Sequence, residues 1–224
     1  MNVLLFGATG MVGLGVLREC LAAEDVKRVV TVGRTATGQR HAKLTEIVRP
    51  DLFDYTGLDA ELQGFDAGFF CLGVSSAGMS EADYSRLTYD ITLNAATTLA
   101  RLNPQMTFVY VSGAGTDSSE QGRSMWARVK GKTENALRRL PFRGVYLFRP
   151  GVIQPLDQVQ SKTGSYRIFY SVASPLLPLL RWLMPNLVLT TRVVGQAMLN
   201  AARRGADSAV LEARDINALA NQQV

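Results

Sequence analysis

The first chemistry that the sequence suggests is the binding of a nucleotide pyrophosphate by a glycine-rich turn. Three glycines lie in the run Phe6-Gly7-Ala8-Thr9-Gly10-Met11-Val12-Gly13, after a strand-like apolar segment and at the start of a helical pattern. Glycines at such a turn let the backbone approach a pyrophosphate, and the free N–H groups of the helix N-terminus face the anion. The spacing differs from GxGxxG, but the strand-turn-helix context supports the prediction of a nucleotide site. The alternative is that the glycines only allow close packing of the helix. We assign cofactor contacts to Gly7, Thr9, Gly10, Met11, Val12 and Gly13.

Arg34 bears on the kind of nucleotide. Folds that prefer NAD usually carry an Asp or Glu about 20 residues past the glycines, where it binds the ribose. Here the second apolar segment ends Val32-Gly33-Arg34, with no acid. A guanidinium suits a 2′-phosphate, and Arg40 is a candidate to assist it. We therefore favour NADP(H) over NAD(H), and a solvated loop cation is the alternative for Arg34.

These residues, with the segments at the later strand ends, resemble the short-chain dehydrogenase/reductase superfamily. The resemblance spans most of the chain and is to its atypical, small NAD(P)-binding branch, with epimerase/dehydratase-like and Tat-interacting reductase-like proteins. It implies that Asp51-Leu52 contacts adenine, that Cys71-Leu72-Gly73-Val74-Ser75 lies beside the cofactor, and that Arg149-Pro150-Gly151 turns near the nicotinamide. It also matches Val111-Ser112-Gly113-Ala114 to the strand that ends at a catalytic serine. The cofactor contacts implied at these places are Asp51, Leu52, Leu72, Gly73, Val74, Pro150 and Gly151.

The resemblance further implies a YxxxK motif, in which the Tyr is an acid or base and the Lys holds the nicotinamide ribose. Residues four apart lie on one helix face, so both side chains can face the cofactor. The matching run is Trp126-Ala127-Arg128-Val129-Lys130, which keeps Lys130 and has Trp126 in place of the Tyr. An indole N–H donates a hydrogen bond but does not act as an acid or base at neutral pH, so the usual acid is absent.

This departure leaves three hypotheses for the function. In the first, hydride passes directly to an electron-poor acceptor such as a flavin or a quinone, and no protein acid is essential. In the second, another group supplies the proton, and the candidates are Tyr84, Tyr89, Tyr166 and Tyr170. In the third, the protein binds the nucleotide without turnover and acts as a redox-sensing or regulatory partner. Trp126 is then a stacking or shielding residue.

Ser112 and Lys130 are the residues to which we assign catalysis. Ser112 would polarise a substrate oxygen and stabilise developing negative charge, whereas the alternative is a serine that satisfies a turn. Lys130 would orient the nicotinamide ribose. Asn94 is interpreted as structural, His41 has no assigned role, and no Ser/His/acid set supports a hydrolase. We expect an NADP(H)-dependent oxidoreductase, or an epimerase/dehydratase-like enzyme, with a small-molecule substrate. The alternative is a redox-silent NADP(H)-binding regulatory or interaction protein.

The elements that must position these residues alternate between short apolar runs and longer helical patterns, which is typical of a parallel sheet covered by helices. Ser80 is expected as a helix N-cap, with Asp83 three residues later. We expect strands at Asn2–Phe6, Arg28–Gly33, Leu44–Val48, Ala67–Leu72, Met106–Ser112, Gly144–Phe148 and Ala209–Glu212. We expect helices at Met11–Ala22, Glu81–Leu102, Met125–Leu140, Gly195–Arg204 and Asp215–Asn221.

Together these elements predict one Rossmann-type α/β domain over residues 1–224, doubly wound, with a mostly parallel sheet in the order 3-2-1-4-5-6. After Pro150 the pattern becomes proline-punctuated and mostly helical. We expect residues 150–224 to form a helical cover over the carboxyl ends of the strands, where ligands bind. The apolar segment Tyr166 to Leu189 suggests a pocket wall or a partner surface, with core packing as the default.

Length and composition exclude several other classes. A chain of 224 residues with 47% hydrophobic and 19% charged residues is neither disordered nor a coiled coil. The net charge of +5 comes from scattered basic residues, so no nucleic-acid binding is expected. Cys20 and Cys71 are isolated thiols, which predicts no metal site and a reducing cytoplasmic location. Prolines interrupt the most apolar stretch, so no membrane span is expected. The sequence leaves open whether the protein is a monomer or a homodimer.

Overall fold

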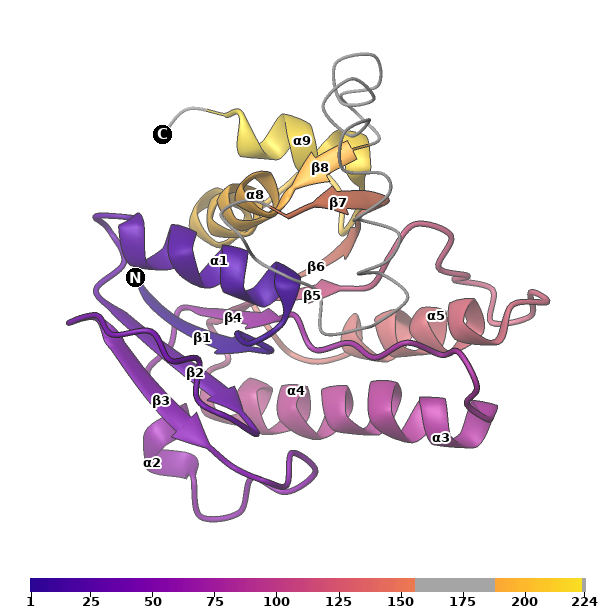
Figure 1. The fold of residues 1–224 in the computed structure, drawn as a ribbon, viewed down its shortest axis with the longest axis horizontal. Helices are drawn as coiled ribbons and strands as arrows, with labels where there is room; N and C mark the ends of the chain where they lie inside the picture. Colours follow the sequence, from indigo (N-terminus) through magenta and orange to yellow (C-terminus); the bar gives the residue numbers. More distant parts are fainter. Residues whose placement is uncertain (156–187, 223–224) are drawn as a thin grey trace.

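The computed structural model describes residues 1–155 and 188–222, and its centre is a seven-stranded parallel sheet between two layers of helices (Figure 1). The strand order β3-β2-β1-β4-β5-β6-β9 confirms the predicted order and adds the late strand at one edge. The strands are β1 (Asn2–Phe6), β2 (Arg28–Gly33), β3 (Leu44–Val48), β4 (Ala67–Phe70), β5 (Thr107–Val111), β6 (Gly144–Arg149) and β9 (Val210–Glu212).

The central strands are continuous apolar runs because helices cover both of their faces. The side chains of Val3, Leu4, Leu5 and Phe6 in β1 are fully buried, and the Phe6 ring stacks on Phe70 of β4 at 5.2 Å between centroids. Edge strand β3 is only half-buried. The glycine turn therefore follows a central strand whose apolar side chains are fully buried.

The helices form one layer on each face of the sheet. Helices α1 (Met11–Ala22) and α8 (Thr191–Arg204) lie on one face, and α4 (Ile91–Leu102) and α5 (Met125–Leu137) lie on the other (Figure 1). Helices α1 and α8 pack so closely that a Cβ at Gly15 would lie 2.5 Å from the Thr191 Cβ. Helix α2 (Asp59–Leu62) is a short segment between β3 and β4, and α9 (Ala213–Ala220) directly follows β9.

The helix expected over residues 81–102 is interrupted. It consists of α3 (Glu81–Ser85), a π-helical turn η1 (Arg86–Asp90) and α4. Its predicted N-cap is confirmed, because the Ser80 hydroxyl accepts the Asp83 backbone N–H at 3.1 Å. Helix α8 begins earlier than expected, at Thr191, because the Thr190 hydroxyl caps it by accepting the Val193 N–H at 3.1 Å.

Beyond β6 the described chain forms a second, small sheet. Strand β7 (Val152–Gln154) pairs in parallel with β8 (Val188–Thr190). Helix α8 then packs against α1 on one face of the main sheet, and α9 packs against α8 (Figure 1). Most of the apolar segment 166–189, with Tyr166 and Tyr170, lies outside the described residues, so the cover over the strand ends stays a prediction. Each helix in residues 1–155 and 188–222 falls short of the length and apolarity needed to cross a bilayer.

Candidate functional site

A cavity of about 670 Å³ opens at the carboxyl ends of the first five strands, around the glycine turn. In a doubly wound parallel sheet, ligands bind in the crevice at this edge. The cavity gathers most of the residues singled out in the sequence, although they come from segments far apart in the chain. The predicted residues that line it are Gly7, Thr9, Gly10, Met11, Val12, Arg34, Leu52, Leu72, Gly73, Val74, Ser112 and Lys130. Those that do not line it are Gly13, Asp51, Trp126, Pro150 and Gly151.

The glycine turn has the shape of an anion cradle. Gly7 has φ +80°, and a Cβ there would lie 2.7 Å from the Cys71 carbonyl carbon; a Cβ at Gly13 would lie 2.1 Å from the Gly7 oxygen. Gly10 is the N-cap of α1, and no side chain caps that helix start. The first N–H groups of a helix have no partner within the helix. The turn therefore fits a pyrophosphate, with Gly13 acting through packing of the helix on the turn.

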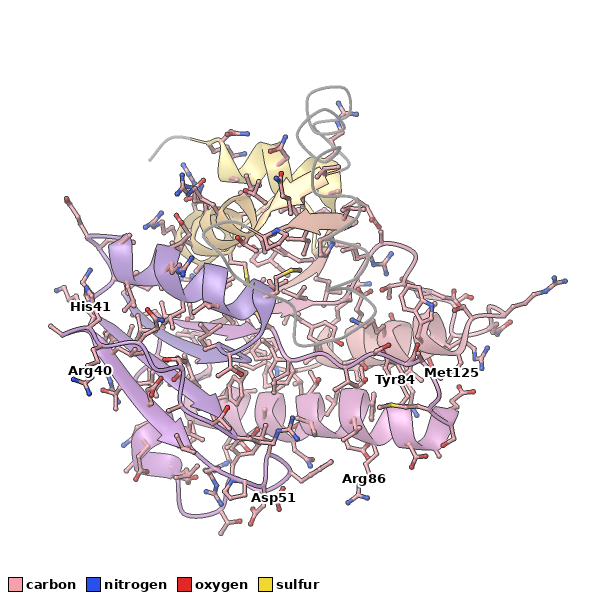
Figure 2. All side chains as sticks on the ribbon, viewed as in Figure 1. Arg40, His41, Asp51, Tyr84, Arg86 and Met125 are labelled. Carbon is pink, nitrogen blue, oxygen red and sulfur yellow. The ribbon has the colours of Figure 1, made fainter. Side chains whose placement is uncertain are left out.

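Arg34 is the cation at the β2 side of the cavity. Its side chain is exposed, and it has no ion-pair partner in the described part of the chain. Arg40 does not line the cavity, and Figure 2 shows Arg40 and His41 projecting outward from the loop before β3. The predicted assistance of Arg40 to Arg34 has no support in this arrangement.

A hydroxyl and carboxylate pair near Arg34 was missed in the sequence. Thr37 and Glu46 both line the cavity, and one Glu46 carboxylate oxygen accepts the Thr37 backbone N–H at 2.8 Å and its hydroxyl. Glu46 lies on β3, opposite Thr31 of β2 in the parallel register. The contact folds the loop after β2 back over β3. The β3 sequence does not alternate between polar and apolar residues, and Glu46, Ile47 and Val48 all line the cavity, so no local pattern marked Glu46.

The outer wall of the cavity is apolar. Val48 and Val74 are 52% and 40% exposed, large fractions for apolar side chains, and both line the cavity together with buried Leu52. Asp51, by contrast, turns away: its carboxylate accepts the Phe53 backbone N–H at 2.7 Å, and Figure 2 shows it at the outer edge of the fold. These valines and Leu52 form walls suited to a flat aromatic base.

Lys130 comes from α5, which packs tightly on the loop after β5. A Cβ at Gly131 would lie 1.7 Å from the Asp117 carbonyl oxygen, so only glycine allows this approach. The Lys130 Nζ donates to the Ser112 carbonyl oxygen at 2.6 Å. Burial lowers the pKa of Lys130 to about 8, and the charge of Glu134 opposes that shift. The ammonium is therefore fixed at the β5 end of the cavity.

Ser112 is buried and makes hydrogen bonds directed into the protein. Its hydroxyl lies 2.6 Å from Oε1 of Glu134 and 3.1 Å from the Phe148 carbonyl oxygen. Its backbone N–H donates to the same Phe148 oxygen at 2.8 Å, and the Ala114 N–H donates to the Pro150 oxygen at 2.9 Å. Pro150 thus supports the loop after β5 from behind, although it does not line the cavity.

A buried ion pair stands behind Ser112, and sequence reasoning missed it. The Glu134 side chain is 1% exposed, and Arg149 donates to it from Nη2 at 2.5 Å and from Nε at 3.1 Å. Arg149 also donates to the Ser118 hydroxyl at 2.6 Å. Hydrogen bonding to Glu134 raises the pKa of Arg149. The i, i+4 spacing of Lys130 and Glu134 on one helix face was an available signal.

The described tyrosines expected as alternative acids lie away from the cavity. Tyr84 is 2% exposed and lies between α3 and α5 (Figure 2), and the Tyr89 ring lies under the Lys132 ammonium at 4.7 Å. Trp126 packs beside Gly115, whose Cβ position is 3.6 Å from the indole ring. Neither tyrosine lines the cavity, so this structure does not support them as the proton source.

Two further side chains have mainly structural surroundings. Asn94 donates from Nδ2 to the Phe53 carbonyl oxygen at 3.0 Å, in agreement with its structural interpretation. Cys71 lines the cavity, but burial raises the pKa of its thiol to about 12. A thiol with so high a pKa is a poor nucleophile at neutral pH.

A parallel sheet in this order, with a glycine turn opening α1 and a cavity at the strand ends, defines a Rossmann-type dinucleotide-binding fold. The model of the NAD dependent epimerase/dehydratase family matches residues 3–124, more than half of the chain. The chain belongs to this NAD(P)-binding family, as the sequence resemblance predicted.

Individual relatives agree with this assignment. The chain is 28% identical to Protein HTATIP2 of Rattus norvegicus over 201 residues, covering 84% of this chain and 81% of the relative. It is 32% identical to mitochondrial Protein fmp52 of Emericella nidulans over 159 residues, covering 68% and 66%. Because the fungal relative is named mitochondrial, the cytoplasmic location stays a prediction.

Solved structures with low sequence identity share the fold. Bordetella bronchiseptica WbmF in complex with NAD+ has a TM-score of 0.69 and 15% identity, covering 100% of this chain and 80% of that one. The carbonyl reductase Sniffer of D. melanogaster has a TM-score of 0.64 and 13% identity, covering 96% and 97%. These likenesses establish the Rossmann-like fold and carry no residue roles.

Proposed function

We propose that this protein is an NADP(H)-dependent oxidoreductase that acts on a small electron-poor or carbonyl acceptor. The observation that carries the proposal is the convergence of the glycine turn, Arg34 and Lys130 on one cavity. NADP(H) would supply the hydride. The chain itself would bind and orient the dinucleotide and provide fixed charges around it.

Each part of the cavity has a role in this proposal. The N–H groups at the start of α1 bind the pyrophosphate, and Arg34 pairs with the 2′-phosphate. Val48 and Val74 pack against the adenine. Lys130, which is fixed by its 2.6 Å bond to the Ser112 carbonyl oxygen, donates to the hydroxyls of the nicotinamide ribose. Residues 1–224 act as one domain.

An electron-poor acceptor such as a flavin or a quinone suits this site. The Trp126 indole N–H is a hydrogen-bond donor that does not act as a general acid, and the described tyrosines considered as acids do not line the cavity. An acceptor that takes hydride without simultaneous protonation has no need of the missing Tyr. Ketones and aldehydes remain the second class of acceptor to screen.

The test is a calorimetric titration of the nucleotide-free protein with NADPH and with NADH. We expect NADPH to bind at least about tenfold more tightly, because a charge-assisted hydrogen bond contributes roughly 1.5 kcal/mol or more. Arg34→Ser should remove this preference, whereas Arg40→Ser should keep it. A folded protein that binds neither nucleotide would refute the proposal, and an equal affinity for both would refute the role of Arg34.

A redox-silent NADP(H)-binding regulatory protein is the second candidate. It is favoured by the Trp126 indole at the position of the acid and by the inward hydrogen bonds of Ser112. Turnover of NADPH with flavins, quinones and carbonyls separates the two functions. If the reductase site is intact apart from its acid, Trp126→Tyr should raise ketone reduction above background; an unchanged background would favour the silent protein.

A further inference from the structure

The Ser112 hydroxyl has two acceptors within hydrogen-bond distance but only one hydrogen to donate. A serine hydroxyl has one donor hydrogen and two acceptor lone pairs. Two acceptors compete for that hydrogen, the Glu134 carboxylate at 2.6 Å and the Phe148 carbonyl oxygen at 3.1 Å. Neither Glu134 nor Phe148 lines the cavity. The hydrogen is thus directed into the protein, whereas Ser112 also lines the cavity.

Glu134 is held in the state that accepts this hydrogen. Arg149 donates to both of its carboxylate oxygens, and the Glu134 side chain is 1% exposed. A carboxylate with a guanidinium partner accepts hydrogen bonds and has no proton to give to Ser112. Releasing the serine proton toward the cavity would leave one bond to a buried charge unmade, which is costly.

We infer that Glu134 is a positioning residue that makes Ser112 a hydrogen-bond acceptor toward the cavity, so the ligand group facing Ser112 is a donor. Hydroxyl, amine and amide N–H groups belong to this class. A bare carbonyl would find its donor at Lys130 instead. The inference rests on the proposed function and deepens it at the same site. Ser112 was first expected to donate a hydrogen bond to a substrate oxygen, whereas here it accepts one from the ligand.

The experiment uses a matched pair of probes, 1-phenylethanol and acetophenone, with the cofactor-free protein, in which neither can react. The alcohol can donate a hydrogen bond, whereas the ketone can only accept. Amide chemical shifts around the cavity report binding of each probe by NMR. We expect the wild-type protein to bind the alcohol more tightly, by about fivefold, because one net hydrogen bond contributes about 1 kcal/mol.

Ser112→Ala is the first variant. It should weaken binding of 1-phenylethanol about fivefold and spare acetophenone, since the alanine removes an acceptor. A loss of acetophenone binding in Ser112→Ala would show that Ser112 donates, and it would overturn the inference. So would a wild-type protein that shows no preference for the alcohol.

Glu134→Gln is the second variant, because its amide can still bond to Arg149 and removes the charged acceptor of the Ser112 proton. We expect acetophenone to bind about threefold more tightly, and we expect this gain to vanish in Ser112→Ala/Glu134→Gln. A folded Glu134→Gln with wild-type affinities for both probes would overturn the role of Glu134. If Glu134→Gln does not fold, the Ser112→Ala result decides the polarity.

Thr133→Val is the matched control. Thr133 is buried beside Glu134 on α5 and donates to the Val129 carbonyl oxygen at 2.8 Å, but it does not line the cavity. It should alter stability without altering the preference between the probes. Titration of the same samples with NADPH tests the proposed function separately. A protein that prefers the alcohol but binds no NADPH would refute that function and retain the inference.

Discussion

The two ends of the cavity are built in different ways. Residues 7–13 contain no charged side chain, and the fit there depends on how closely Gly7 and Gly13 let the backbone approach itself. At the β5 and α5 end, Lys130, Glu134 and Arg149 are largely removed from water and balance one another. The first end depends on steric fit and the second on charge balance, so substitutions should affect them differently.

The largest expected effect comes from breaking the charge balance. Arg149→Ala leaves the Glu134 carboxylate buried without the guanidinium that hydrogen-bonds to both of its oxygens, and we expect the free energy of unfolding to fall by about 3–5 kcal/mol. Urea denaturation followed by circular dichroism measures this loss. Arg101→Ala is the control, because its ion pair with Asp59 has both side chains more than half exposed and contributes about 1 kcal/mol or less.

Similar losses in the two arginine variants would contradict this view of the β5 and α5 end. The buried pair would then be no more sensitive than a solvent-exposed one. A loss confined to Arg149→Ala would instead show that the stability depends on the buried ion pair far more than on the exposed one. Replacing both Arg149 and Glu134 by apolar residues should restore part of the lost stability.

The steric end should respond to a single methyl group. In Gly13→Ala the new Cβ meets the Gly7 carbonyl oxygen at 2.1 Å, so the helix must move away from the turn. We expect a loss of about 1–3 kcal/mol in stability and at least about tenfold weaker NADPH binding. At Gly33, a Cβ would make ordinary contact at 3.7 Å with the Thr35 oxygen, so Gly33→Ala should retain near-wild-type stability. Equal stability losses in both variants would refute the steric account of Gly13.

The same contrast explains how much the sequence could predict. Glycine reports a steric requirement locally, and continuous apolar runs report buried strands, so the turn and the strand order followed from short windows of sequence. The Glu134–Arg149 pair joins a helix to a strand, and Glu46 meets Thr37 across a loop. Such partners are set by packing between distant segments. No window around Glu134 contains Ser112, so its hydrogen bond could not be predicted.

The helix interruption at Arg86–Asp90 and the position of Asp51 have the same explanation. A π-helical turn and a straight helix share the same apolar periodicity over a few residues, so the pattern does not separate them. Asp51 matched a strand-end acid in the resemblance, but a local turn takes its carboxylate, which accepts the Phe53 N–H. Local hydrogen bonding of Asp to its own turn competes with any ligand contact.

The smallest expected effect is a pH dependence that belongs to Lys130. Burial lowers the pKa of Lys130 from 10.5 to about 8, so its ammonium is mostly charged at neutral pH and loses its charge as the pH rises through about 8. NADPH affinity should therefore fall about tenfold between roughly pH 7 and pH 9, because a hydrogen bond from a charged group contributes roughly 1.5 kcal/mol. Isothermal titration across this range measures the change.

Stability of the cofactor-free protein should change in the opposite direction. Between about pH 8 and pH 10.5 the unfolded chain binds more protons at Lys130 than the folded chain, so this group makes the free energy of unfolding rise with pH. Lys130→Met should remove both trends, whereas Arg34→Ser should weaken NADPH binding yet keep the pH dependence, since a guanidinium stays charged throughout. A wild-type affinity for NADPH that stays constant from pH 7 to about pH 9 would show that the charge of Lys130 does not contribute to binding. The charge balance at the β5 and α5 end would then affect the stability of the protein and not its affinity for NADPH.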